Sequence, residues 1–151
     1  MPLIIRPAAA DDQYAITAIV RAARLNPRDL DWQRFLLARW GQDIIGVGQV
    51  RPHRDGSREL ASIAVVPEWQ GNGVGRMLVQ ASSDRCREKG GRRLIVSTAA
   101  ADIGNLRFYQ RQGFRMYKVV QDAFTPQTGY AEGQLVGGIP LRDQVFLELE
   151  L

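Results

Sequence analysis

The sequence predicts an α/β (α+β) domain built on a mixed sheet of about seven strands, with helices on its faces. Three observations predict this fold class. Short apolar segments typical of strands alternate with segments of helical periodicity. Two of the short segments, residues 59–66 and 93–98, are apolar on both faces, as strands in the middle of a sheet are. The resulting order of elements, β-α-β-β-β-α-β-α-β-β, is that of a layered domain with right-handed βα crossovers.

The chain opens with a short strand at residues 3–6, followed by a helix that Asp11 or Asp12 can cap. The residues that fall at helical spacing are Tyr14, Ile16, Ile19, Val20 and Ala23. The segment Asn26-Pro27-Arg28-Asp29 then breaks the helix.

Three strands are expected before the second helix, at residues 34–40, 44–51 and 59–66. The residues Gly41-Gln42-Asp43 form the turn between the first two strands. A tight hairpin is expected at Asp55-Gly56, because this pair readily takes the positive φ that such turns need. Pro67 ends the third strand.

The rest of the chain is predicted to hold a helix over 73–89, a strand over 93–98, a short helix over 103–112, and strands over 114–120 and 144–149. In the long helix, the residues expected to lie along one side are Val74, Met77, Leu78, Ala81 and Arg85. Residues 122–142 are rich in Gly, Pro and Thr and are expected to form a long loop.

Length and composition favour one globular domain, residues 1–151. Apolar residues make up 45% of the 151 residues, enough for one core. No apolar run approaches the ~20 residues of a membrane span, so no membrane partner is expected. The first residues lack the features of a secretory signal. Because Cys86 is the only cysteine, we expect a soluble protein of the reducing cytoplasm.

The formal net charge of +4 suits a phosphorylated ligand. The basic residues are scattered rather than gathered in a run, so a solubilising surface is favoured over nucleic-acid binding. One cysteine and one histidine, His53, cannot form a zinc site of the usual kind, and we expect no metal.

The most informative segment is Gln70-Gly71-Asn72-Gly73-Val74-Gly75-Arg76, between a central strand and the long helix. A helix N-terminus offers unpaired N–H groups and partial positive charge, and glycines let a phosphate approach them. The spacing fits neither the dinucleotide fingerprint nor the P-loop. The segment therefore predicts a pyrophosphate cradle of another kind, the alternative being a glycine turn without a ligand.

The pattern Gln70-x-x-Gly73-x-Gly75 resembles the coenzyme A loop of the GNAT N-acetyltransferase superfamily. The preceding segment, residues 63–70, is similar to that family's strand and entry turn. A second signature, a helix with Phe-Tyr followed by Gly-Phe, is similar to residues 106–114. The resemblance covers most of the chain. It implies a GNAT-like fold with a splayed central sheet, and acetyl-CoA as the cosubstrate.

The resemblance also implies particular contacts with acetyl-CoA. Main-chain groups of Ile63, Ala64 and Val65 would pair with the pantetheine arm like an added strand, and an N–H near Val65 could polarise the thioester carbonyl. Backbone N–H groups at the glycine loop would hold the diphosphate. The implied cofactor-binding residues are Ile63, Ala64, Val65, Gln70, Gly71, Asn72, Gly73, Val74, Gly75, Arg76, Asp102, Asn105 and Tyr109.

Tyr109 would be the general acid that protonates the departing thiolate; the alternative is a half-buried aromatic residue. Family members often carry Asn seven residues before this Tyr, where this chain has Asp102. Asp102 or Asn105 could contact coenzyme A, and Asp102 could equally cap the short helix.

Glu59 is the candidate general base, because histone-type members carry a catalytic glutamate at this spacing before the loop. It could act directly or through a water, or it could simply pair with Arg58 or Arg54. His53 is a weaker candidate base in an exposed turn. Cys86 fits a small core residue better than a nucleophile.

The amine acceptor would bind between the segments 26–32 and 122–141, and the sequence does not identify it. We expect an N-acetyltransferase that transfers acetyl directly to an amine of a small molecule or protein in a ternary complex. The rival interpretations are a non-catalytic acyl-CoA-binding sensor or scaffold, and an interaction domain that uses its positive charge. A homodimer is also possible, since exposed edge strands often pair.

Overall fold

The computed structural model describes residues 3–26 and 28–151, so Met1, Pro2 and Pro27 lie outside the described residues. The helix break predicted at residues 26–29 and the acceptor segment predicted at residues 26–32 both contain Pro27. Each therefore lies partly outside the described residues. The main elements are β1 (Leu3–Pro7), α1 (Gln13–Ala22), β2 (Phe35–Trp40), β3 (Asp43–Pro52), β4 (Arg58–Val65), α2 (Val74–Glu88), β5 (Arg93–Ala99), α3 (Ile103–Arg111), β6 (Arg115–Val120) and β9 (Gln144–Glu150).

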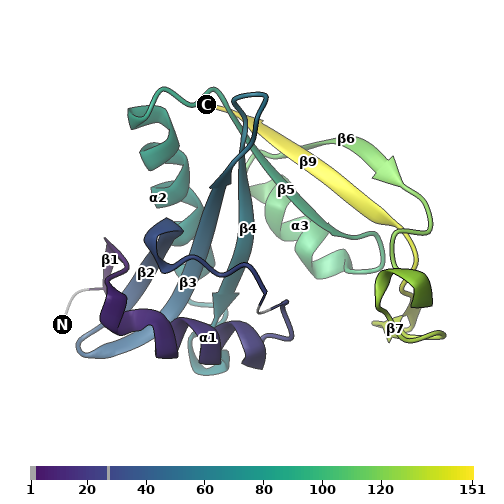
Figure 1. The fold of residues 1–151 in the computed structure, drawn as a ribbon, viewed down its shortest axis with the longest axis horizontal. Coiled ribbons are helices and arrows are strands. Elements are labelled where there is room, and N and C mark those ends of the chain that lie inside the picture. The colour runs from purple at the N-terminus through teal and green to yellow at the C-terminus, as the bar shows by residue number, and fades with distance from the viewer. Residues whose placement is uncertain (1–2, 27) are drawn as a thin grey trace. The chain divides into compact units, whose positions relative to one another are not determined.

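In the described ranges, seven of the strands form a central sheet in the order β1-β2-β3-β4-β5-β9-β6, flanked by helices (Figure 1). This confirms the predicted α/β (α+β) class and the number of strands. The chain divides into two compact units, one up to Leu94 with Leu151 and one from Ile95 to Glu150. The single domain expected over residues 1–151 stays a prediction.

In the unit up to Leu94, β1 to β4 pair antiparallel and carry apolar residues on both faces. Successive side chains of a strand point to opposite faces, so β2 supplies residues to two clusters. The α1-side cluster is Ile16, Val20, Phe35, Leu37, Val47 and Ala64. The α2-side cluster is Leu36, Ala38, Ile45, Val74 and Leu78. Helices α1 and α2 therefore cover opposite faces of these strands (Figure 1).

A β-bulge interrupts the pairing of β3 with β4. Gln49 lies opposite Ser62, but the next residue, Val50, lies opposite Leu60. Ala61 is therefore an extra residue on β4 without a partner on β3. Such an insertion reverses the alternation of side chains on either side of it.

The bulge determines the face of the sheet to which the side chains at each end of β4 point. Val65 packs on the α2-side cluster, and Arg58 lines a cavity beside Ser82 of α2. These two β4 residues are an odd number apart, so strict alternation would place them on opposite faces. With the bulge they share the α2 side, and Glu59 faces the α1 side.

Three residues predicted on the apolar stripes are exposed, and one of them, Ala23, lies just beyond the end of α1. Tyr14 is 87% exposed and Met77 is 38% exposed. The buried residues lie on another side of each helix. At about 100° per residue, Tyr14 is about 160° around α1 from Ile16, and Met77 is about 160° around α2 from Val79. The buried contacts come from Ile16 and Val20 in α1 and from Val74, Leu78 and Val79 in α2.

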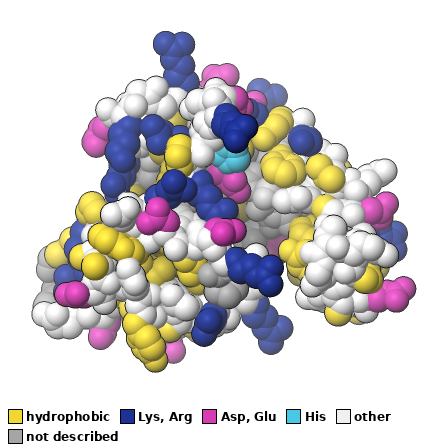
Figure 2. Space-filling view, in the orientation of Figure 1, with side chains coloured by type: hydrophobic (Ala, Val, Ile, Leu, Met, Phe, Trp, Pro, Cys, Tyr) yellow, Lys and Arg dark blue, Asp and Glu magenta, His cyan; other side chains and the backbone are white. Residues whose placement is uncertain are grey.

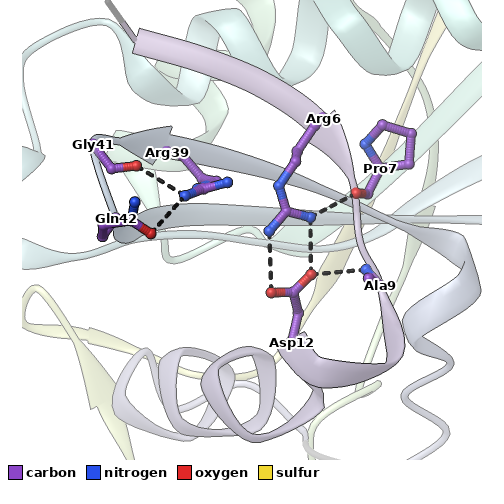
Figure 3. Close-up of polar contacts among 7 residues, drawn as sticks. All are labelled: Arg6, Pro7, Ala9, Asp12, Arg39, Gly41 and Gln42. Atoms are coloured by element: carbon purple, nitrogen blue, oxygen red, sulfur yellow. Dashed lines mark hydrogen bonds and ion pairs between the residues drawn. The ribbon is translucent and has the colours of Figure 1, made fainter. Parts of the chain in front are cut away.

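An ion pair ties β1 to the start of α1 (Figure 3). The Arg6 guanidinium donates to both carboxylate oxygens of Asp12, at 2.9 and 3.2 Å. The Ala9 N–H also donates to Asp12, at 2.7 Å. Asp12 directly precedes α1 as predicted, but its side chain caps no N–H of that helix. Its contacts lower the pKa of the Asp12 carboxyl, chiefly through the hydrogen bond from Arg6.

In the unit from Ile95, β6 and β9 pair antiparallel, and Tyr109 of α3 packs edge-on against Phe114. The predicted long loop contains a small hairpin, β7 (Leu135–Val136) and β8 (Ile139–Pro140), which the sequence patterns did not predict. Gly137 and Gly138 both take positive φ at its turn.

Among the described residues, no helix combines the length and hydropathy needed to span a membrane.

Candidate functional site

The glycine turn before α2 has a backbone that requires glycine. Gly71 has φ +80° and Gly73 has φ +82°, in the left-handed region that side chains disfavour. A Cβ at either position would meet no atom within 4 Å. The requirement is therefore conformational, and the space beside both glycines is open to a ligand.

The turn presents a row of free donors. The first hydrogen bond of α2 runs from the Met77 N–H to the Gly73 carbonyl, at 3.0 Å. In the described part of the chain, no acceptor lies in ordinary hydrogen-bond geometry to the N–H groups of residues 71–76. Unpaired N–H groups at the positive end of a helix dipole form an anion site. This is the geometry expected of a pyrophosphate cradle.

Side chains of the turn hold it against the end of β4. Gln70 Nε2 donates to the Val65 carbonyl at 3.1 Å. Asn72 Nδ2 donates to the Trp69 and Gln70 carbonyls, both at 3.3 Å. These two polar side chains therefore fix the backbone that the glycines bend, rather than pointing away as free ligand contacts.

The pairing of β3 with β4 decides which main-chain groups near Val65 are available. The Val66 N–H donates to the Ile45 carbonyl at 2.9 Å, and hydrogen-bonded pairs alternate along an antiparallel ladder. Main-chain groups of Ala64 therefore point toward β3, whereas those of Ile63 and Val65 point away from it. On that side, Gln70 Nε2 donates to the Val65 carbonyl.

The Glu59 side chain contacts that of His53. His53 Nε2 and Glu59 Oε1 are 2.8 Å apart across the β3–β4 hairpin. The two side chains are 40% and 25% exposed, and Figure 2 shows the histidine in cyan at the surface. The alternative role, an ion pair with Arg58 or Arg54, does not appear among the ion pairs of the described residues. The two candidate bases form one contact pair, which the sequence alone did not bring together.

Tyr109 is buried, at 5% exposure, in α3. Burial raises the pKa of Tyr109 to about 12, and the charge of Asp102 adds to the rise. Tyr109 is thus a protonated donor at neutral pH.

Asp102 caps α3, which is one of the two roles expected for it. Its carboxylate accepts from the Asn105 N–H at 2.9 Å. Asn105 Nδ2 donates to Thr98 Oγ1 at 3.2 Å and is exposed. Contacts of either residue with coenzyme A stay predictions.

The two segments expected to hold the acceptor contain packed aromatic residues. Leu30 and Trp32 pack against the α1-side cluster. Phe124 and Tyr130 stack edge-on within the 122–142 segment, with ring centroids 5.0 Å apart. Part of each segment therefore packs within the fold. Tyr130, at 41% exposure, is more accessible than Phe124.

The candidate residues fall in both compact units. Glu59, His53, the end of β4 and the glycine turn belong to the first, while Asp102, Asn105 and Tyr109 belong to the second. Cys86 is buried at 2% exposure, which confirms it as a core residue. No cluster of three or more His, Cys, Asp or Glu occurs among the described residues.

Residues 8–114 match the model of the Acetyltransferase (GNAT) family. The chain belongs to this family. The match includes the glycine turn and Tyr109, and it ends before the 122–142 segment.

Relatives and solved structures agree with the family assignment. The chain is 31% identical over 111 residues to an uncharacterized N-acetyltransferase, YvbK, of Bacillus subtilis, covering 74% of this chain and 70% of the relative. It is similar to a GNAT family acetyltransferase from Elizabethkingia anophelis with acetyl-CoA bound, with a TM-score of 0.84, 25% identity and coverage of 99% and 98%. It is also similar to a Bacillus subtilis acetyltransferase in complex with CoA, with a TM-score of 0.78, 26% identity and 99% coverage of both chains.

Proposed function

We propose that this GNAT protein is an acetyl-CoA-dependent N-acetyltransferase, which transfers acetyl directly to an amine of a small molecule or protein in a ternary complex. The observation that carries the proposal is the row of unpaired N–H groups at residues 71–76, which fits the diphosphate of coenzyme A. Two similar structures are described with acetyl-CoA or CoA bound, which supports the same cosubstrate.

The end of β4 supplies the remaining contacts in this proposal. Main-chain groups of Ile63 and Val65 pair with the pantetheine arm, as an added strand would. The Val65 N–H polarises the thioester carbonyl and stabilises the charge that develops on its oxygen. Tyr109 donates its proton to the departing sulfur.

Binding of acetyl-CoA tests the cradle directly. We expect Gly73→Val to weaken acetyl-CoA binding by at least about 100-fold in calorimetry, because the side chain disfavours the required φ and shields the N–H groups. Gly90→Val is the matched control. Gly90 also has a positive φ, +80°, and open space for a Cβ, but it lies at the other end of α2. Equal losses in both variants would argue against the cradle.

Turnover separates the enzyme from a sensor that binds without reacting. The purified protein with acetyl-CoA and a panel of primary amines should release free thiol, measured with a thiol reagent. Binding of acetyl-CoA without thiol release from any amine would favour the non-catalytic sensor or scaffold.

The strand geometry limits what Glu59 can do. Glu59 and Val65 are six residues apart on β4, about 20 Å along an extended strand, and the bulge directs them to opposite faces. Glu59 therefore reaches an amine held beside Val65 only through water molecules. We therefore expect Glu59 to contribute less to kcat than a general base in direct contact with the amine would.

Substitution of the Glu59–His53 pair measures this contribution. Glu59→Gln should lower kcat about tenfold, below the 10²–10⁴-fold typical of direct general catalysis, and His53→Gln should have a similar effect because the two side chains are in contact. Glu68→Gln, an exposed carboxylate outside the pair, is the control. An unchanged kcat in Glu59→Gln would remove the pair from proton transfer.

A further inference from the structure

A cavity of about 180 Å³ lies against the last turns of α2, within the unit up to Leu94. Ser82, Arg85, Cys86 and Lys89 line it from one face of that helix, since they follow the i, i+3, i+4, i+7 spacing. Strands β2, β3 and β4 form the other walls. The glycine turn is at the opposite end of α2, about 20 Å away along a helix of this length.

The lining is strongly cationic. Arg34, Arg58, Arg85 and Lys89 line the cavity, and no Asp or Glu of the described residues does. Arg34 has a loose, exposed pairing with Asp31, at 3.5 Å. Figure 2 shows Lys and Arg side chains, in dark blue, gathered over the region where Figure 1 draws α2 and its neighbouring strands. The walls thus carry an excess of positive charge.

Two polar atoms of this lining are buried without a partner. Ser82 is 0% exposed, and neither its Oγ nor Arg58 Nε has a hydrogen-bond partner in the described residues. The neighbouring Ser83 hydroxyl, in contrast, donates to the Val79 carbonyl at 2.9 Å. Burying unpaired polar groups costs free energy, and a ligand that bonds to both would recover it.

The dipole of α2 accounts for only part of this arrangement. Cations are favoured at a helix C-terminus, which suits Arg85 and Lys89. The dipole does not account for Arg58, which comes from β4, or for the unpaired hydroxyl of Ser82. The Cys86 thiol does not supply the missing negative charge, because burial raises its pKa and keeps it protonated at neutral pH.

The volume limits the size of an occupant. A water needs about 10–15 Å³ of such space, and sites for drug-sized ligands span roughly 300–1,000 Å³. A cavity of 180 Å³ therefore suits a molecule of a few heavy atoms. Guanidinium groups bind the oxygens of a phosphate in forked geometry, and a hydroxyl can donate to a third oxygen.

We infer that the cavity at the C-terminal end of α2 is a second anion site, which binds inorganic phosphate or a small phosphomonoester. It is separate from the glycine turn and independent of the proposed reaction. Arg58 and Ser82 form the floor of the site, and Arg85 and Lys89 close it from the helix.

Titration with inorganic phosphate at constant ionic strength, followed by calorimetry and thermal unfolding, tests the site. Phosphate should bind and raise the Tm, while an equal ionic strength of chloride should not. Arg85→Gln and Lys89→Gln should each weaken phosphate binding about tenfold. Arg87→Gln is the matched control, because Arg87 lies in the same helical turn, pairs with Asp84 and does not line the cavity. The same titration with glycerol phosphate shows, by comparison of the two affinities, whether the site prefers a phosphomonoester or the free ion.

Two further variants locate the bound phosphate. Ser82→Ala should leave the ligand-free protein as stable as before or more so, because it removes an unpaired buried hydroxyl, yet reduce the phosphate-dependent rise in Tm. Gly73→Ala should leave phosphate binding unchanged if phosphate occupies this cavity. No binding, a loss in Gly73→Ala alone, or equal affinities in Arg85→Gln, Lys89→Gln and Arg87→Gln would overturn the inference.

Discussion

Tyr109→Phe should lower kcat about 100-fold and leave the KM for acetyl-CoA within a factor of two. A general acid in contact with the reacting atoms contributes 10²–10⁴-fold, and its efficiency falls as its pKa moves away from the working pH. Burial raises the pKa of Tyr109 to about 12, far above neutral pH. The expected effect therefore lies at the lower end of that range.

The raised pKa also predicts the shape of the pH–rate profile. Tyr109 stays protonated at every pH below about 11, so its ionisation produces no basic limb in the range where the enzyme is assayed. The profile of Tyr109→Phe should keep the wild-type shape at a lower height. Tyr14→Phe removes a hydroxyl from an exposed ring and serves as the control. Unchanged kcat in Tyr109→Phe would exclude the residue from the mechanism.

Asp12→Ala should destabilise the protein by about 2 kcal/mol at pH 7. Removing one partner of an ion pair costs 3–5 kcal/mol when the pair is buried and 0–1 kcal/mol when it is exposed. The Asp12 side chain is 11% exposed and that of Arg6 is 30% exposed, so an intermediate value applies. The variant also leaves the Ala9 N–H without its acceptor.

The pH dependence of this effect has a definite sign. The folded state lowers the pKa of Asp12 below its ordinary value of 3.8, so the stabilisation is fully present above about pH 4 and is lost as the pH falls through the folded-state pKa. Urea unfolding of wild type and Asp12→Asn should therefore differ at pH 7, and the difference should shrink as the pH falls through the lowered pKa of Asp12. Asp84→Asn, at an exposed pair with Arg87, should change stability by less than about 0.5 kcal/mol over the same pH range.

Most of the architecture could be predicted from local patterns because each strand is bounded by a turn signal. The strand expected at 44–51 forms over Asp43–Pro52, and the helix expected at 73–89 forms over Val74–Glu88. The β7–β8 hairpin was missed because strands of two residues are too short to show alternation. The glycine turn was predicted because its residue types alone specify its conformation.

The contacts that depend on register could not be predicted in the same way. His53 and Glu59 meet because the hairpin at Asp55-Gly56 folds one strand end back on the other, and only the pairing of β3 with β4 shows which side chains then face each other. The sequence offered one signal, two candidate bases six residues apart around a tight turn. The exposure of Tyr14 likewise depends on which side of α1 meets the strands.

The extra residue at Ala61 gives β4 two functionally independent ends. Deleting Ala61 would move the side chains of the preceding β4 residues to the opposite face of the sheet. Arg58 would then leave the proposed phosphate cavity, and Glu59 would enter the apolar layer under α2, where a carboxylate is poorly tolerated. A deletion of Ala61 should therefore be far more harmful than its replacement by a larger side chain.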